Sequence, residues 1–136
     1  MKNTTAWSIT FCLIAALSCL TLKWALAFSR ETGSGITITF TEGYGIFAWQ
    51  VGLIASLHTI LAGFMFATAG IKQIAVWASL SAFIGAALLL LLFNLYAYTI
   101  GWSWPRYPGP WVNLLSTLGL LALTSIDLRV ALRSKK

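Results

Sequence analysis

Acidic residues are scarce in this chain, since three Asp and Glu stand against nine Lys and Arg in 136 residues. The sequence also has one histidine and two cysteines. These few scattered groups cannot supply a clustered set of metal ligands, so we expect no metal site. No nucleophile motif, phosphate-binding glycine loop or dinucleotide fingerprint is present. We therefore expect no catalytic residues and no bound cofactor, and we expect that the protein is not an enzyme.

Charged residues of both signs make up only 9% of the chain, against about 25% in soluble domains. Hydrophobic residues make up 59%. The net charge of +6 comes from the chain ends and the expected loops, where membrane topology and anionic lipid headgroups explain it better than nucleic acid does. The composition predicts one small integral membrane domain covering residues 1–136, with lipids and not nucleic acid as its surroundings.

Four apolar segments are long enough to span a bilayer, which needs about 20 helical residues. The clearest is the segment 74–100, which no charged residue interrupts. The sequence therefore predicts an all-α membrane protein with four transmembrane helices and short outer loops. The predicted spans are 7–28, 46–69, 74–100 and 111–127, of which the last is the shortest.

Positively charged residues are divided unequally between the two sides of this predicted bundle. One side carries Lys2, Lys72 and the basic tail at 129–136, whereas the other side carries Arg30, Arg106 and Lys23, whose long side chain reaches the headgroups. Because Lys and Arg favour the cytoplasmic side, both termini and the turn at Lys72 are expected in the cytoplasm. We expect a multi-pass protein of the bacterial plasma membrane with two loops outside.

The first outer loop contains a stretch typical of a short β-strand. Residues 36–41 alternate apolar and polar side chains and are followed by a glycine-containing turn. A lone strand leaves its backbone groups unpaired, and the other outer loop is too rich in proline to pair with it well. We therefore expect the strand to add to another chain. The expected partner contacts are Ile36, Ile38 and Phe40.

The second outer loop, at 101–111, contains all three prolines of the chain beside several aromatic residues. Proline cannot continue either neighbouring helix, and Trp favours the headgroup layer of a membrane. We expect a stiff loop on the membrane surface, with Trp102 and Trp104 as further partner contacts.

Four polar side chains are predicted to lie in the outer half of the bilayer. They are Lys23, Gln50, Asn94 and Asn113. Intramembrane polar groups usually find partners, so these residues could form one shared cluster that opens outward. In the alternative reading, Lys23 reaches the headgroups alone and the two Asn residues make separate interhelical hydrogen bonds.

His58 is predicted near the middle of the second span. Its small neighbours Ala55, Ala62 and Gly63 leave room for a haem or chlorophyll, to which the imidazole could be an axial ligand. The alternative is a structural histidine that is hydrogen-bonded within a helix interface.

Three functions are compatible with these features. The first is a non-catalytic accessory subunit or assembly factor of a larger bacterial plasma-membrane complex, for example a respiratory or photosynthetic one. The second is a small homo-oligomeric transporter or channel with the outer polar cluster at its mouth. In length the chain resembles small four-helix multidrug transporters, but those depend on an acidic residue in the first span, and this chain has none there. The third is a cofactor-binding membrane protein that uses His58.

Overall fold

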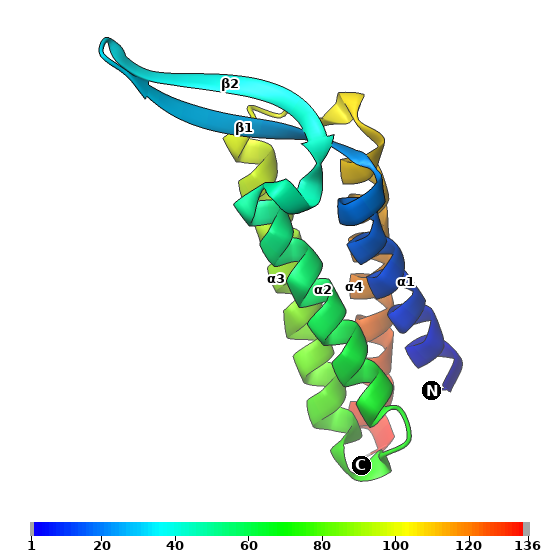
Figure 1. Cartoon of the computed structure of the whole chain (residues 1–136). Helices are drawn as coiled ribbons and strands as arrows, with labels where there is room; N and C mark the ends of the chain where they lie inside the picture. Colours follow the sequence, from blue (N-terminus) through cyan, green and yellow to red (C-terminus); the bar gives the residue numbers. More distant parts are fainter. Residues whose placement is uncertain (1, 135–136) are drawn as a thin grey trace.

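The computed structural model describes residues 2–134, which form a four-helix bundle with a two-stranded hairpin at one end (Figure 1). The helices are α1 (Lys2–Thr21), α2 (Trp49–Thr68), α3 (Ala75–Thr99) and α4 (Pro108–Ser134). The strands are β1 (Lys23–Thr32) and β2 (Gly35–Tyr44). All four helices are long and apolar enough to cross a membrane. The predicted arrangement of four such helices is therefore confirmed.

Each helix packs against two neighbours in the bundle. Both α1 and α3 contact α2 and α4, so α2 and α4 face each other across the centre. The interior is filled by small and aliphatic side chains, including Ile54, Ala55, Ala86, Leu89 and Leu120. Large apolar side chains also cover the outside of every helix, as Leu17, Ile60, Leu91 and Leu115 illustrate. Such a surface suits lipid chains, because its contact with water would be unfavourable.

The connections bring the two chain ends to the same end of the bundle. A short turn containing the one-turn helix η2 (Lys72–Ile74) joins α2 to α3, and α1 begins and α4 ends beside it (Figure 1). We call this the terminus end. The opposite end, which we call the hairpin end, carries β1, β2 and the one-turn helices η1 (Gly45–Phe47) and η3 (Trp104–Arg106).

The first helix is placed differently from the predicted span 7–28, because α1 begins at Lys2 and ends at Thr21. The residues that follow form β1, although Trp24, Leu26 and Phe28 keep the sequence apolar. Hydrophobicity alone does not separate helix from strand in such a short segment. The last helix also differs, since α4 covers Pro108–Ser134 and is the longest helix and not the shortest.

The hairpin confirms a strand at 36–41 but corrects its pairing partner. β2 pairs along its whole length with β1 in antiparallel register, from Lys23 opposite Tyr44 to Thr32 opposite Gly35. The expectation that this strand pairs with a second chain was therefore wrong. Most of β1 had been assigned to the predicted span 7–28, so its residues were not considered as a pairing strand. Gly35 lies at the tip of the hairpin and has a φ of 134°, a backbone conformation that residues other than glycine rarely adopt.

Candidate functional site

The base of the hairpin is fixed to the bundle by Trp24, whose side chain is completely buried. Its indole N–H donates to the carbonyl of Ser18 in the last turn of α1, at 2.9 Å. Its ring meets that of Tyr96 edge to face, with 5.0 Å between the centroids. The Tyr96 hydroxyl in turn donates to the carbonyl of Ala25 in β1, at 2.8 Å. These contacts connect the first strand to both α1 and α3.

Glycine lets the neighbouring backbone approach this tryptophan. A Cβ atom added at Gly109, in the first turn of α4, would overlap the Trp24 ring and would lie 2.8 Å from the Lys23 carbonyl oxygen. A Cβ at Gly45 would lie 2.5 Å from the side chain of Val51 and 3.1 Å from the Trp24 ring. Glycine at these two positions thus allows the base of the hairpin to pack closely against α2 and α4.

Trp104, which was expected to contact a partner, is buried inside its own chain. It is 7% exposed, and its ring packs against Phe93 and Trp111 at centroid distances of 5.4 and 4.7 Å. Aromatic residues suit either a headgroup layer or a packed interior, and sequence does not distinguish the two. Trp102 is 54% exposed, so of the two tryptophans it is the one that remains accessible.

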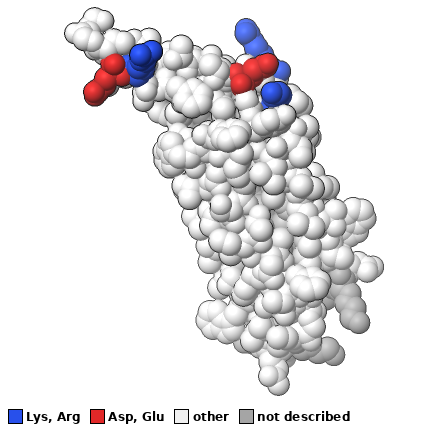
Figure 2. Space-filling view, viewed as in Figure 1, with Lys and Arg blue, Asp and Glu red and all other residues white. Residues whose placement is uncertain are grey.

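Beyond its base, the hairpin leaves the bundle and is exposed on both faces. Figure 1 shows the two strands extending sideways past the helices, at a steep angle to them. Ile36, Ile38 and Phe40 are 70%, 57% and 55% exposed. In the view of Figure 2 the charged side chains gather on the hairpin and beside its base, whereas the visible flank of the bundle carries none.

The register separates the two faces of the hairpin. Ile36, Ile38 and Phe40 lie opposite Glu31, Ser29 and Ala27, respectively. Neighbouring residues of a strand point to opposite faces, so this apolar row lies on the face opposite Trp24 and Leu26, which are buried against the bundle. We call Ile36, Ile38 and Phe40 the apolar row.

The four polar residues of the expected outer cluster have separate environments. Lys23 Nζ lies over the ring of Tyr44, 4.6 Å from its centroid, and Gln50 is buried near the start of α2. Asn94 is exposed and donates to the Leu90 carbonyl of its own helix at 2.9 Å. Asn113 is fully buried and donates to the Ala15 carbonyl of α1 at 3.3 Å. Only Asn113 thus makes the expected interhelical hydrogen bond.

His58 lies at the bundle centre and is completely buried. Its Nδ1 is 2.8 Å from the carbonyl of Ile54, which can only accept, so Nδ1 carries the proton. Its Nε2 then accepts from the Thr117 hydroxyl at 3.2 Å, which connects α2 with α4 across the bundle. Both ring nitrogens thus have hydrogen-bond partners within the chain, which is the arrangement of the structural alternative.

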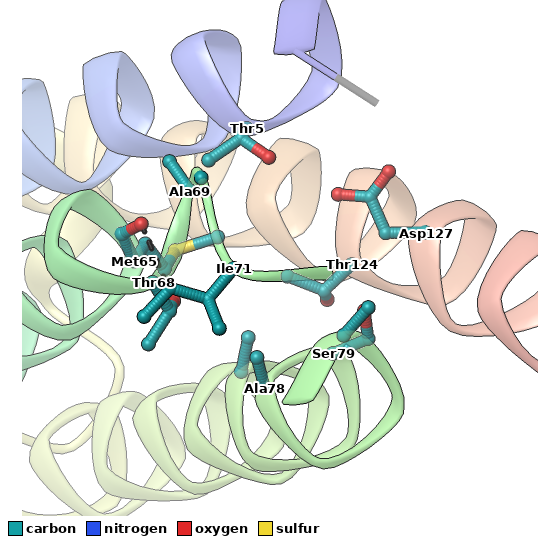
Figure 3. Close-up of a pocket in the computed structure, with 12 residues that line it drawn as sticks. Thr5, Met65, Thr68, Ala69, Ile71, Ala78, Ser79, Thr124 and Asp127 are labelled. Carbon is teal, nitrogen blue, oxygen red and sulfur yellow. Dashed lines mark hydrogen bonds between the residues drawn. The ribbon is translucent and has the colours of Figure 1, made fainter. Parts of the chain in front are cut away.

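A feature that the sequence did not reveal is a cavity of about 190 Å³ at the terminus end (Figure 3). Its walls come from all four helices and from the turn between α2 and α3. The lining includes the polar residues Thr5, Thr68, Ser79, Thr124 and Asp127. Asp127 is 8% exposed, although it is the last residue of the predicted span 111–127. Its spacing from Thr124 and Ala131, which are also buried, is the signal that could have placed it on the inner face of α4.

Comparison of the chain with protein-family models, with curated proteins and with solved structures gives no match. A function therefore has to be inferred from the surfaces and the cavity described above, because a helical bundle as such hosts many functions.

Proposed function

We propose that this protein is a non-catalytic accessory subunit or assembly factor, which inserts its four helices into a membrane and contacts a larger integral membrane protein through the hairpin. The observation that carries this proposal is the apolar row. It is exposed on an arm that the bundle does not cover, while the base of the same arm is held firmly by Trp24 and Tyr96.

The direction of the arm favours a partner that is itself in the membrane. Because the hairpin leaves the bundle more sideways than along the helix axes, its tip lies to one side of the bundle, beyond the level at which the helices end (Figure 1). A membrane protein that stands next to the bundle is within reach of this tip. An exposed row of three large apolar residues is also typical of a contact surface, and an open strand edge can pair with a further strand.

The charge distribution supports an orientation for the inserted protein. Lys2, Lys72, Arg129 and Arg133 all belong to the segments that meet at the terminus end. By the preference of Lys and Arg for the cytoplasmic side, we place the terminus end in the cytoplasm and the hairpin outside a bacterial plasma membrane.

Site-specific photo-crosslinking in cells tests this function. A photoreactive residue at Ile38 should crosslink to a larger membrane protein, whereas the same residue at Thr39 should crosslink weakly, because neighbouring strand residues face opposite sides. The double variant Ile38→Ser and Phe40→Ser should reduce co-purification of that partner in mild detergent. The matched double variant Thr37→Ser and Thr39→Ser should leave it unchanged.

Two results would overturn the proposal. A crosslinked product of twice the mass of this chain would show that the apolar row contacts a second copy, in keeping with the homo-oligomeric alternative. Equal crosslinking from Ile38 and Thr39 would show that the face of the hairpin does not select a partner.

A further inference from the structure

The cavity at the terminus end offers mainly hydrogen-bond acceptors. Thr124 donates its hydroxyl proton to the Leu120 carbonyl at 2.9 Å, and Thr68 donates to the Phe64 carbonyl at the same distance. A hydroxyl group whose single proton is engaged still has lone pairs that can accept. The ionised carboxylate of Asp127 can only accept. A ligand that brings protons of its own therefore fits Thr68, Thr124 and Asp127.

The charge in the cavity also favours a ligand that donates hydrogen bonds, because that charge is negative. Of the lining residues that the structure describes, Asp127 is the one that carries a charge, and Figure 3 shows no hydrogen bond from it to the other residues drawn. Arg129 and Arg133, which follow it on α4, are exposed. Among the side chains that the structure describes, none forms an ion pair with this carboxylate. A buried charge without a partner is unfavourable, and a cation in the cavity would provide that partner.

Most of the remaining lining is small and apolar, with Ala69, Ala75, Ala78, Ala82 and Ile71 among it. The volume of about 190 Å³ is somewhat larger than an engineered cavity of about 150 Å³ that holds benzene. Such walls suit an apolar body of one ring or a short alkyl chain. We propose that this cavity binds a small primary ammonium compound, with its ammonium group at Asp127 and its apolar body against the alanines. This site is independent of the partner surface on the hairpin.

A primary ammonium group can come from a free amine or from the ethanolamine headgroup of a lipid. Both would meet the same acceptors in the cavity. The two sources differ in one measurable respect, because the headgroup competes with a free amine only when ethanolamine lipids are present.

Titration calorimetry on the full chain in phosphatidylcholine nanodiscs tests the site, with cyclohexylammonium as the probe and cyclohexanol as its neutral counterpart. We expect saturable binding of cyclohexylammonium. Asp127→Asn keeps the shape of the side chain and removes its charge, and it should weaken binding of the amine at least about tenfold. It should leave any binding of cyclohexanol unchanged. Ala78→Leu keeps the carboxylate but fills the cavity, and it should abolish binding of both compounds.

Absence of saturable binding, or equal binding by the wild type and both variants, would overturn the proposal, since it would mean that the amine only partitions into lipid. Each variant is first compared with the wild type in helix content and elution volume, and Ala78→Leu decides the question if Asp127→Asn does not fold. Weaker amine binding in nanodiscs containing phosphatidylethanolamine would support the site with the headgroup as its occupant. Unchanged affinity would support the site with a free amine as its ligand.

Discussion

The two ends of the bundle fill their interiors with side chains of very different size. At the hairpin end, large aromatic residues occupy the space between strand and helices, with Trp24, Tyr96 and Trp104 all buried. At the terminus end, no aromatic residue lines the interior among the described residues, four of the twelve lining residues are alanine, and a cavity remains. The hairpin end is thus closely packed and fixes the position of the hairpin, whereas the terminus end contains unfilled space. Substitutions that remove or add atoms at each end test this difference.

The largest effect is expected from Trp24→Ala, which removes the anchor of the hairpin. The variant loses a completely buried ring and the indole hydrogen bond to Ser18. We expect the free energy of unfolding to fall by about 3–5 kcal/mol, as for other buried Trp or Phe truncations. Chemical unfolding in mixed micelles measures this change, and hydrogen exchange should rise along β1.

Trp102→Ala is the matched control for this prediction, since Trp102 is a tryptophan at the same end with an exposed ring. Its effect should remain within about 0.5 kcal/mol. Similar losses in both variants would mean that the hairpin base is not a packed anchor, and the contrast between the two ends would then fail.

A smaller loss is expected from Gly109→Ala, which adds one carbon at the packed end. The new Cβ would overlap the Trp24 ring, and either the ring or the start of α4 must move. Overpacking of this kind costs about 1–3 kcal/mol. Gly63→Ala is the control, because nothing lies within 4 Å of a Cβ there and alanine is the better helix former. Unfolding of the two variants in the same micelles should show a loss for the first and none for the second.

The sequence predicted the helical part of this fold because each helix is a long apolar run that can be recognised locally. It did not predict where α1 ends. Trp24, Leu26 and Phe28 continue the apolar run, and their strand conformation depends on pairing with residues 11 to 19 positions later. Such pairing is a property of two segments, so a hydrophobicity profile of one segment cannot detect it. The same limit explains why the strand at 36–41 was left without a partner.

The sequence predicted some features of the candidate sites and missed others. A hydrogen-bonded His58 was one of the two alternatives that the sequence left open, but its partner Thr117 lies far away in sequence and was not predicted. The burial of Trp104 did not follow, because it depends on rings contributed by Phe93 and Trp111. The cavity could not be predicted at all. Its walls come from four helices and a turn, and one of them depends on the continuation of α4 to Ser134, which places Asp127 within the helix and not at its end.

The smallest effect on stability is expected at the terminus end, from Ala78→Leu. The added carbons should enter the cavity, since Ala78 is part of its lining and is only half-buried. The apolar surface gained would be offset in part by the lost rotamer freedom of leucine, and we expect a change within about 0.5 kcal/mol. Ala86→Leu is the control on the same helix, because Ala86 is completely buried away from the cavity, and overpacking there should cost about 1–3 kcal/mol. Unfolding of both variants in mixed micelles gives the comparison directly. If Ala78→Leu were as destabilising as Ala86→Leu, the terminus end would be as tightly packed as the rest of the bundle, and neither the contrast between the ends nor the ammonium site could stand.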